Sequence, residues 1–441
     1  MFYIVEQESK LESLEKLARL GLYVDVISTN DLYHPKLCST VAVYLRLIGS
    51  EHGYIIPIKH DEGLNVSKDR VYEILSKASK LYTRNKKELL YHFNLQGAID
   101  LSLLYSMVKF NRLEYTKESN TLNYFYNKYR DFADINQLIP ISKLYESCSK
   151  VYDQIKGVID YKIPESFDFY NKTATNVFYL LEQPGLGVHY DDYIKMFKPK
   201  DPVFNTNNNS VLTSYNLYNA TSRPTNAFNS VNFAAIPKSP EHRKSFRPQN
   251  DIFVEFDFDG YHLRLLCDQI DFELTSDSAH KQLAKHYFGT QDITEEQYLE
   301  AKQINFQAIY GKIPEEHRNL EIFKKISEFI KELWRVYEED GEVLEPISGK
   351  PFGKELKDMH PAKLMNYVMQ SLETSRNILI LKEVLRYLQN KKTNVVLYTY
   401  DSFLFDFSKD DGIETLDDIK EILEEGGKYP IKFKHSKDLC L

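Results

Sequence analysis

The chain has 441 residues, of which 42% are hydrophobic and 27% are charged, and its formal net charge is −8. This composition excludes a disordered chain and supplies enough apolar side chains for two or three domains. The cysteines are far apart and form no CxxC pair, which argues against a disulfide framework or a structural zinc and predicts a reducing, cytoplasmic location. No apolar run approaches the roughly 18 residues that cross a bilayer, and the start MFYIVEQESK lacks a secretion pattern, so no membrane association is expected.

Strand-like and helix-like patterns alternate in residues 1–110. The runs GLYVDVIS, TVAVYLRLI and GYIIPI predict strands, and apolar spacing predicts helices near Val71 to Leu81 and Leu101 to Val108. This segment is therefore expected to be an α/β domain. From about Asn111 to Leu181 the pattern is mostly helical and is broken by prolines, and the polar tract NTNNNS that follows predicts a loop, so residues 111–214 are expected to form a helical connector.

Residues 215–441 change character. A β-type segment (DIFVEFDFDGYHLRLL) is followed by a long helical stretch from Ser278 to Glu339, a helix from Ala362 to Leu388 and a closing hairpin (NVVLYTYDSFLFDF). Just before them, basic residues gather between Arg223 and Arg247. Because the net charge is negative, any surface for nucleic acid must be local, and this basic stretch is either such a surface or a solvated face.

Acidic residues recur at two places in this last segment. In IFVEFDFDG, side chains alternate along a strand, so Glu255, Asp257 and Asp259 share one face. The run VVLYTYDSFLFDF predicts a hairpin with Asp401 at its tip. Taken alone, each pattern is ordinary, since strands have solvated faces and aspartate is common in turns. If both strands lie in one sheet, Asp257 and Asp401 meet and can bridge two Mg²⁺ ions.

A third pattern lies in ITEEQYLEAKQINFQAIYGK, which predicts a helix. Tyr298, Lys302, Phe306 and Tyr310 recur every fourth residue and share a slowly winding face. An aromatic stripe is ordinarily a core face, but a lysine buried without a partner is costly. The pattern therefore favours a face that meets a phosphate-bearing ligand, with the aromatic rings against sugar and base.

Taken in order, these segments resemble the family A DNA polymerases, the family of bacterial repair polymerases and many phage replicases. NATSRPTNAFNSVNFAAIP resembles the Thr-Gly-Arg signature, VEFDFDGYHLRLL motif A, EAKQINFQAIYG the fingers helix, NYVMQSLETS the helix with a template-contacting glutamine, and LYTYDSF motif C. The motifs are collinear through the last ~230 residues, which makes this signal far more specific than any one short motif.

The resemblance implies a right-hand fold with an antiparallel palm sheet and helical fingers (roughly 276–355) in residues 215–441, and a reduced thumb within 111–214. It implies addition of dNTPs to the primer of a primer–template DNA by two-metal phosphoryl transfer with Mg²⁺, or Mn²⁺ in its place. The implied catalytic and metal-binding residues are Asp257 and Asp401, with the carbonyl of Phe258 completing the metal site. The residues implied at the nucleotide are Lys302, Phe306, Tyr310, His262 and Phe258. The residues implied at the DNA are Arg223, Arg243, Asn366 and Gln370.

Several positions depart from the family pattern. His262 stands where motif A has the glutamate that blocks a ribose 2′-hydroxyl, but its imidazole still fills space against Tyr310, so deoxynucleotides are expected to remain preferred. Ser402 replaces the second acid of motif C, which predicts a weaker metal site. Tyr298 replaces an arginine that touches phosphate, and Ser222 replaces the glycine of the Thr-Gly-Arg signature.

Residues 1–110 resemble the ribonuclease H-like proofreading exonuclease domain that precedes such polymerases. Asp25 matches an acid of the first exonuclease motif, but Ile27 stands where glutamate is expected. In TRNKKELLYHF, Asn85 aligns with the second motif while Leu89 occupies its aspartate position. Since an active exonuclease needs several clustered acids for its metal pair, no proofreading is expected.

Only residues 193–213 separate GLGVHYDD from SYNLYNATSRP, where the family inserts a long helical thumb. A reduced thumb makes fewer phosphate contacts, so weak processivity is expected unless a processivity or single-strand-binding protein holds the DNA. The abundance of Asn, Lys and Tyr and the compact size suggest a phage or virus with an AT-rich genome.

Two other interpretations stay open. A single-subunit RNA polymerase shares the palm acids and the lysine-to-tyrosine spacing, although Phe306 and His262 speak against it. A catalytically inactive nucleic-acid-binding relative would explain the missing accessory acids, but Asp257, Asp401 and Lys302 are all retained.

Overall fold

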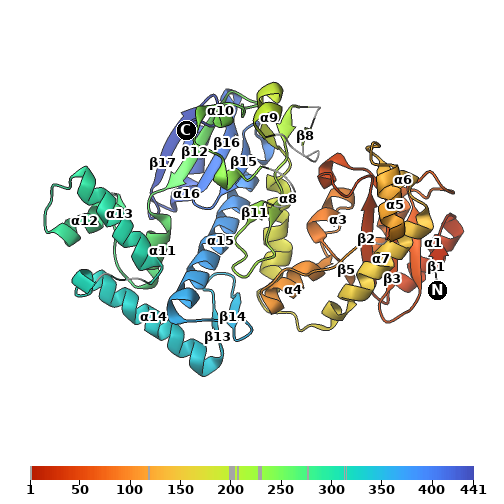
Figure 1. Ribbon diagram of the computed structural model, residues 1–441, viewed down its shortest axis with the longest axis horizontal. Helices are drawn as coiled ribbons and strands as arrows, with labels where there is room; N and C mark the ends of the chain where they lie inside the picture. Colours follow the sequence, from red (N-terminus) through yellow and green to blue (C-terminus); the bar gives the residue numbers. More distant parts are fainter. Residues whose placement is uncertain are drawn as a thin grey trace. The chain divides into compact units, whose positions relative to one another are not determined.

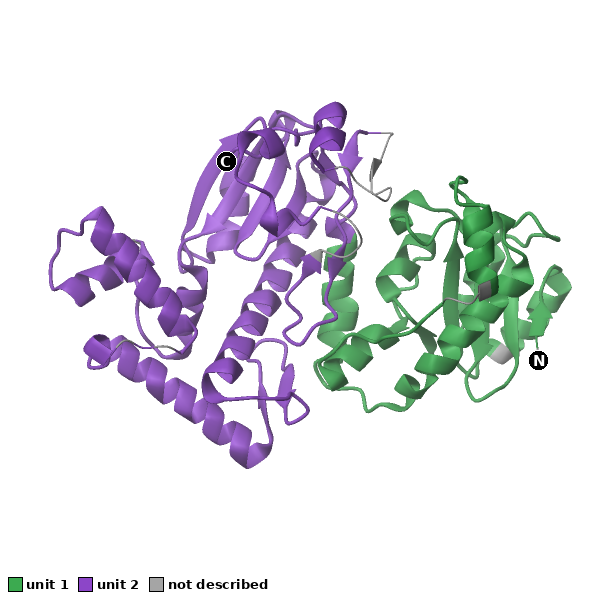
Figure 2. Ribbon diagram, in the orientation of Figure 1, with its two compact units in different colours: residues 1–179, 199–205, 227–230 green, residues 180–198, 206–226, 231–441 purple. Residues whose placement is uncertain are grey.

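The computed structural model describes residues 2–117, 120–197, 204–205, 208–226, 231–275, 278–311, 313 and 315–441. The chain forms two compact units (Figure 2). Unit 1 contains residues 1–179, 199–205 and 227–230, and unit 2 contains residues 180–198, 206–226 and 231–441. Residues 111–179 therefore group with the N-terminal sheet, and neither unit ends at the predicted boundaries of 110 and 214. Within the described ranges, no helix is long and apolar enough to cross a membrane.

Unit 1 is built on a mixed six-stranded sheet with the order β1-β4-β3-β2-β5-β6. Its antiparallel centre is flanked by the parallel pairs β1–β4, β2–β5 and β5–β6. The strands are β1 (Phe2–Ile4), β2 (Leu22–Ser28), β3 (Thr40–Leu47), β4 (Gly53–Pro57), β5 (Leu81–Thr83) and β6 (Ile99–Asp100). The helices of this part of the chain are α1 (Glu8–Ala18), α2 (Lys68–Ser76), α3 (Lys86–His92), α4 (Leu101–Lys109), α5 (Asn120–Lys128), α6 (Ile135–Leu138), α7 (Ile141–Ile155) and α8 (Thr175–Leu181).

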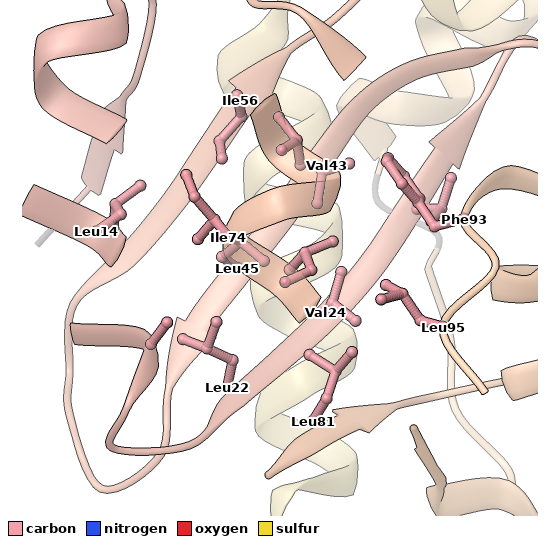
Figure 3. Packing of buried hydrophobic residues seen from close by; sticks show 14 of the residues in the cluster. Leu14, Leu22, Val24, Val43, Leu45, Ile56, Ile74, Leu81, Phe93 and Leu95 are labelled. Carbon is pink, nitrogen blue, oxygen red and sulfur yellow. The ribbon is translucent and has the colours of Figure 1, made fainter. Parts of the chain in front are cut away.

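The core of unit 1 confirms the sequence periodicity. The three predicted strands are β2, β3 and β4, and the second predicted helix is α4. The first predicted helix ends at Ser76, and Leu81 instead begins β5. Val24, Leu45 and Ile74 belong to one buried cluster (Figure 3). Burying each such side chain contributes about 1.5–3 kcal/mol, which fixes the position of β2 in the sheet.

Unit 2 contains an antiparallel four-stranded sheet, which we call the palm sheet, with the order β15-β16-β12-β17 (Figure 1). Its strands are β12 (Ile252–Phe258), β15 (Asn394–Thr399), β16 (Ser402–Phe407) and β17 (Ile431–Ser436). Phe256 packs against Phe405 and Phe433, with ring centroids 5.6 Å apart in both pairs. The helices α15 (Pro361–Tyr387) and α16 (Glu414–Glu424) pack against each other, and α16 contacts β17.

The predicted helical stretch 278–339 is three helices, α12 (Ala279–Phe288), α13 (Glu295–Ile309) and α14 (Glu321–Asp340). Gly289 ends α12 and Gly311 follows α13, and both have left-handed φ values, of +63° and +74°. Thr294 and Gln297 form a capping box that starts α13. In space, α12 packs on α13 and α14 packs on α15.

The prediction of β structure through DIFVEFDFDGYHLRLL is wrong in its second half. The strand ends at Phe258, Gly260 takes a left-handed φ of +64°, and α11 (Tyr261–Gln269) begins. Tyr261, Leu263 and Leu265 alternate like a strand, but Leu266 and Cys267 are buried as well. A helix buried on most sides has no polar face, so alternation is a poor guide there.

Unit 2 also contains several short elements outside the palm sheet. They are β7 (Leu186–Gly187), α9 (Tyr190–Phe197), β9 (Ser210–Val211), β10 (Tyr215–Asn216), β11 (Thr225–Asn226), α10 (Pro240–Arg243), β13 (Glu342–Leu344) and β14 (Pro351–Gly353). The strands β7 and β9, β10 and β11, and β13 and β14 form antiparallel pairs. The hairpin of β13 and β14 contacts α14 and α15.

Candidate active site

The palm sheet brings Asp257 and Asp401 to the same end of two neighbouring strands. Asp257 lies opposite Ser402 in the register of β12 and β16, and the N–H of Phe258 donates to the carbonyl of Asp401 at 3.0 Å. Burial, then Asp401, then Glu255 raise the pKa of Asp257 to about 6. The two carboxylates therefore repel each other, as expected for acids brought together without a cation.

The neighbouring acids form close ion pairs, whereas Asp257 and Asp401 are stabilised by more distant charges, those of Lys434 and Lys432 for Asp257 and those of His262 and Arg223 for Asp401. Glu255 accepts a hydrogen bond from Ser402 Oγ at 3.1 Å and has Lys434 Nζ at 3.8 Å. Asp259 is buried and pairs with Lys432 Nζ at 2.7 Å, so the third acid of the predicted face is neutralised. Among the residues that the structure describes, neither Asp257 nor Asp401 has an ion-pair partner.

This pair fits a divalent cation. The described part of the chain holds no group of three or more His, Cys, Asp or Glu side chains placed to bind a metal. Magnesium, however, is commonly held by one or two carboxylates and completes its octahedron with water and substrate phosphates. A cation between Asp257 and Asp401 would also relieve the repulsion that raises the pKa of Asp257.

A buried glutamate on α15 organises the next layer of the site. Glu373 is 2% exposed, and its Oε2 lies 3.1 Å from Arg223 Nη2 and 3.3 Å from His262 Nε2. The Arg223 guanidinium also lies 3.8 Å from the ring centroid of Tyr400. Burial alone would raise the pKa of Glu373, but His262 and Arg223 hold it below its usual range. Desolvation and the charge of Glu373 raise the pKa of Asp401.

The turn that carries Arg223 is fixed from its other side. Ser222, which replaces a glycine of the family signature, has a left-handed φ of +54°, a conformation that glycine adopts without strain. The fully buried Lys350 donates from Nζ to Ser222 Oγ at 2.5 Å, and burial lowers the pKa of Lys350 to about 7. Asn219 Nδ2 donates to the carbonyl of Arg223 at 2.7 Å. The hydroxyl of serine thus supplies an anchor that glycine could not.

The predicted nucleotide face of α13 is exposed rather than core. Phe306 and Tyr310 are each 48% exposed, and with Lys302 they line a pocket on this face. The opposite side of the helix is buried through Ala301, Ile304, Asn305, Ala308 and Ile309. The helix α13 contacts α11, which follows the strand that carries Asp257, so its exposed face is connected to that strand through α11.

The other residues predicted to contact DNA already form hydrogen bonds or ion pairs within the protein. Gln370 Nε2 donates to Asn366 Oδ1 at 3.1 Å, so both amides share one half-buried face of α15. Arg243 Nη1 donates to the carbonyl of Leu439 at 3.1 Å, and Arg247 pairs with Asp438 at 3.1 Å. The C-terminal segment therefore already binds part of the basic stretch.

In unit 1, an arginine lies beside Asp25, the acid that the sequence aligned with the first exonuclease motif. Asp25 is 4% exposed and accepts hydrogen bonds from Arg84, whose Nε and Nη2 lie 3.2–3.3 Å from its oxygens. Arg84 Nη2 also donates to Glu88 at 3.1 Å. Asn85 accepts from the N–H of Glu88 and caps α3, while Leu89 is part of the core.

Sequence reasoning missed Glu373 and a second polar residue, Asn377, that is fully buried on α15. Both lie in the helix after Gln370, within a run of polar residues from Ser371 to Asn377 of which only Leu372 is apolar, and the sequence gives no sign that this run is buried.

Comparison with solved structures shows the fold. The structure is similar to the POL domain of Pol1 from M. smegmatis in complex with DNA primer-template and dNTP, with a TM-score of 0.72 and 12% sequence identity over 99% of each chain. No protein-family model matches the chain. No curated protein matches it either. The chain therefore has the fold of a DNA polymerase domain, although few residues are identical to those of this neighbour.

Proposed function

We propose that the chain is a template-directed DNA polymerase of the family A type that adds dNTPs to a primer 3′ end. The observation that carries the proposal is the meeting of Asp257, on β12, with Asp401, in the turn that leads into β16, where neither carboxylate has a close ion pair among the described residues of a polymerase fold. The solved neighbour binds primer-template DNA and dNTP, and its fold supports the same partners here. Exposed Lys302 and Phe306 on α13, and Tyr310 directly after it, supply a surface for the nucleotide.

In this proposal Asp257, Asp401 and the carbonyl of Phe258 hold the cations. Two Mg²⁺ ions, when bound, would activate the primer hydroxyl and stabilise the charge of the leaving group. Lys302 binds the triphosphate, Phe306 packs on the sugar, and Tyr310 occupies the templating slot until the fingers close.

The polar residues around the acids hold the DNA and select the sugar. Arg223 enters the minor groove with its guanidinium oriented by Glu373 and Tyr400. His262, held by the same glutamate, excludes a 2′-hydroxyl, so dNTPs are preferred to NTPs. Asn366 and Gln370 face the template, and Arg243 the DNA backbone.

The test is extension of a labelled primer on a defined template with Mg²⁺, using dNTPs or NTPs. We expect extension with dNTPs and its loss in Asp401→Ala. Asp410→Ala is the matched control, because Asp410 is an exposed acid paired only with exposed Lys392. Equal use of NTPs would identify an RNA polymerase or a chain without sugar selection, and DNA binding without extension would identify an inactive relative.

We also propose that unit 1 does not proofread. Its support is the Arg84 guanidinium, which takes the charge-neutralising place beside Asp25 that a metal would need. A mismatched primer should persist when it is incubated with Mg²⁺ and no dNTP. Rapid degradation that disappears in Asp25→Ala would refute this proposal.

Weak processivity is the last part of the proposal, and it rests on the short segment between Asp192 and Ser214. With few contacts to the product duplex, the isolated chain should dissociate after short extensions, and a processivity or single-strand-binding protein would lengthen them. Long products from a single binding event, measured with a heparin trap, would contradict this expectation.

A further inference from the structure

The two candidate metal ligands lie where the palm sheet ends. Strand pairing fixes Asp257 against Ser402, but Tyr400 and Asp401 form the turn beyond the pairing. Tyr400 has a left-handed φ of +59°, a region that side chains other than glycine, asparagine and aspartate seldom occupy. The direction of Asp401 therefore depends on what holds Tyr400 in this conformation.

Asn377 supplies that support. Its side chain is fully buried on α15, and Nδ2 donates to the carbonyl of Tyr400 at 2.8 Å and to the hydroxyl of Tyr398 at 3.0 Å. Its Oδ1 accepts from the hydroxyl of Tyr261 at 2.7 Å. Tyr261 begins α11, directly after the Asp257 strand, so one amide joins the turn of Asp401 to the turn that follows Asp257.

The amide is itself oriented by a chain of donors. Arg376 Nη1 donates to the Tyr261 hydroxyl at 2.7 Å, and that hydroxyl in turn donates to Asn377. The Arg376 guanidinium is fixed 3.5 Å from the ring centroid of Tyr429 and pairs with Glu425 at 3.0 Å. Successive hydrogen bonds in a buried site polarise one another, so this series of hydrogen bonds from Arg376 through Tyr261 to Asn377 holds the carbonyl of Tyr400 firmly.

We infer that Asn377 is a positioning residue that sets Asp401 relative to Asp257 and thereby tunes the affinity of the pair for divalent cations. This inference rests on the proposed function, because it takes the two carboxylates as the cation site. Asn377 touches neither a substrate nor the reacting atoms in this arrangement. It acts through the backbone of Tyr400.

The test compares Asn377→Leu with Asn136→Leu. Both remove a buried amide that donates to a main-chain carbonyl at 2.8 Å, but Asn136 lies in unit 1 and donates to Ser28. Leucine removes the donor at similar volume and adds no charge that could itself attract a cation. Binding of Mn²⁺ is counted by electron paramagnetic resonance on a complex with dideoxy-terminated primer–template, in which no chemistry occurs. The Mg²⁺ dependence of primer extension, the dNTP KM and the DNA Kd are measured alongside.

We expect Asn377→Leu to weaken Mn²⁺ binding about 10- to 100-fold and to raise the half-saturating Mg²⁺ concentration in parallel, as loss of an indirect support of a metal ligand typically does. The dNTP KM should stay within about 3-fold, since Lys302, Phe306 and Tyr310 lie elsewhere, and the DNA Kd should rise less than the cation affinity falls, because Tyr400 contacts only Arg223 among the proposed DNA-binding residues. Asn136→Leu should leave all four quantities at wild-type values.

Wild-type cation affinity in a folded Asn377→Leu protein would overturn the inference, as would equal effects of the two leucine variants. If Asn377→Leu does not fold, Tyr261→Phe keeps the ring and removes only the hydroxyl that orients the amide, and it should weaken Mn²⁺ binding about 3- to 10-fold. No change in Tyr261→Phe would then overturn it. A wild-type protein that binds Mn²⁺ but extends no primer would instead refute the proposed function.

Discussion

The two units hold aspartates in different electrostatic situations, because Asp25 of unit 1 is buried whereas Asp257 of unit 2 is half-buried and Asp401 is exposed. In unit 1, Asp25 is almost fully buried against Arg84, which also pairs with Glu88. In unit 2, Asp257 faces Asp401 with no ion-pair partner for either among the described residues, and its pKa rises to about 6. The first arrangement is complete within the protein, whereas the second leaves negative charge that a ligand must balance.

This difference teaches how to separate structural acids from functional ones. Holding two carboxylates close together without a cation is costly, as is burying a single unpaired one, so a fold keeps such an acid where a cation or a reaction requires it. The charge of Asp25 is balanced by Arg84, so substitution of Asp25 should lower the stability of unit 1. The repulsion between Asp257 and Asp401 is not balanced by a close ion pair, so substitution of Asp257 should lower activity rather than stability.

The largest expected effect is on catalysis. Asp257→Asn keeps the shape of the side chain but removes a cation ligand, so primer extension should fall more than about 1000-fold. The protein should be no less stable without metal, because the substitution relieves repulsion with Asp401. Single-turnover extension and thermal melting check both parts. A loss of activity below about tenfold would show that Asp257 is no cation ligand.

The second effect is on the stability of unit 1. Asp25→Ala should leave primer extension within about 3-fold but lower the free energy of local unfolding by about 3–5 kcal/mol, because Arg84 stays buried with only Glu88 as an acidic partner. Hydrogen exchange of the β2 and β5 amides measures this loss. The double variant Asp25→Ala/Arg84→Met should recover part of it. If the wild-type protein degrades primer without dNTP faster than Asp25→Ala does, Asp25 is instead a catalytic residue of a nuclease.

The smallest effect is a pH dependence without divalent metal. The pKa of Asp257 is higher in the folded state than in the unfolded state, so between about pH 4 and 6 the folded state holds more protons and stability falls as pH rises. We expect about 1–2 kcal/mol from this residue. Asp406, whose pKa burial also raises to about 6, contributes with the same sign, so the difference between wild type and Asp257→Asn isolates Asp257.

Trp334, on α14 of unit 2, reports that unfolding by its fluorescence. With saturating Mg²⁺, the difference in the free energy of unfolding between wild type and Asp257→Asn should no longer change with pH above pH 6, because the bound cation favours the charged carboxylate. An unchanged difference with Mg²⁺ would mean that no cation binds there.

Local sequence patterns predicted much of the fold. Alternation located β2, β3, β4 and the hairpin of β15 and β16, because each has a polar or turn-forming boundary next to a clear apolar run. It failed at α11, because the helix has no exposed side that would show a helical period. It also failed at β17, because most residues of this strand (IKFKHS) are exposed and few are apolar. An edge strand of this kind is recognised only by its partner, β12.

The sequence by itself indicated the strands and helices with clear apolar spacing, the face of α13 that carries Lys302 and Phe306, and the candidate pair Asp257 and Asp401. Only the tertiary structure decided which charges are balanced: Arg84 beside Asp25, Glu373 between Arg223 and His262, and Asn377 beneath Tyr400. The reason is physical. A helix or strand follows from the spacing of neighbouring residues, whereas the energy of a buried charge or amide depends on partners that the fold brings from distant parts of the chain.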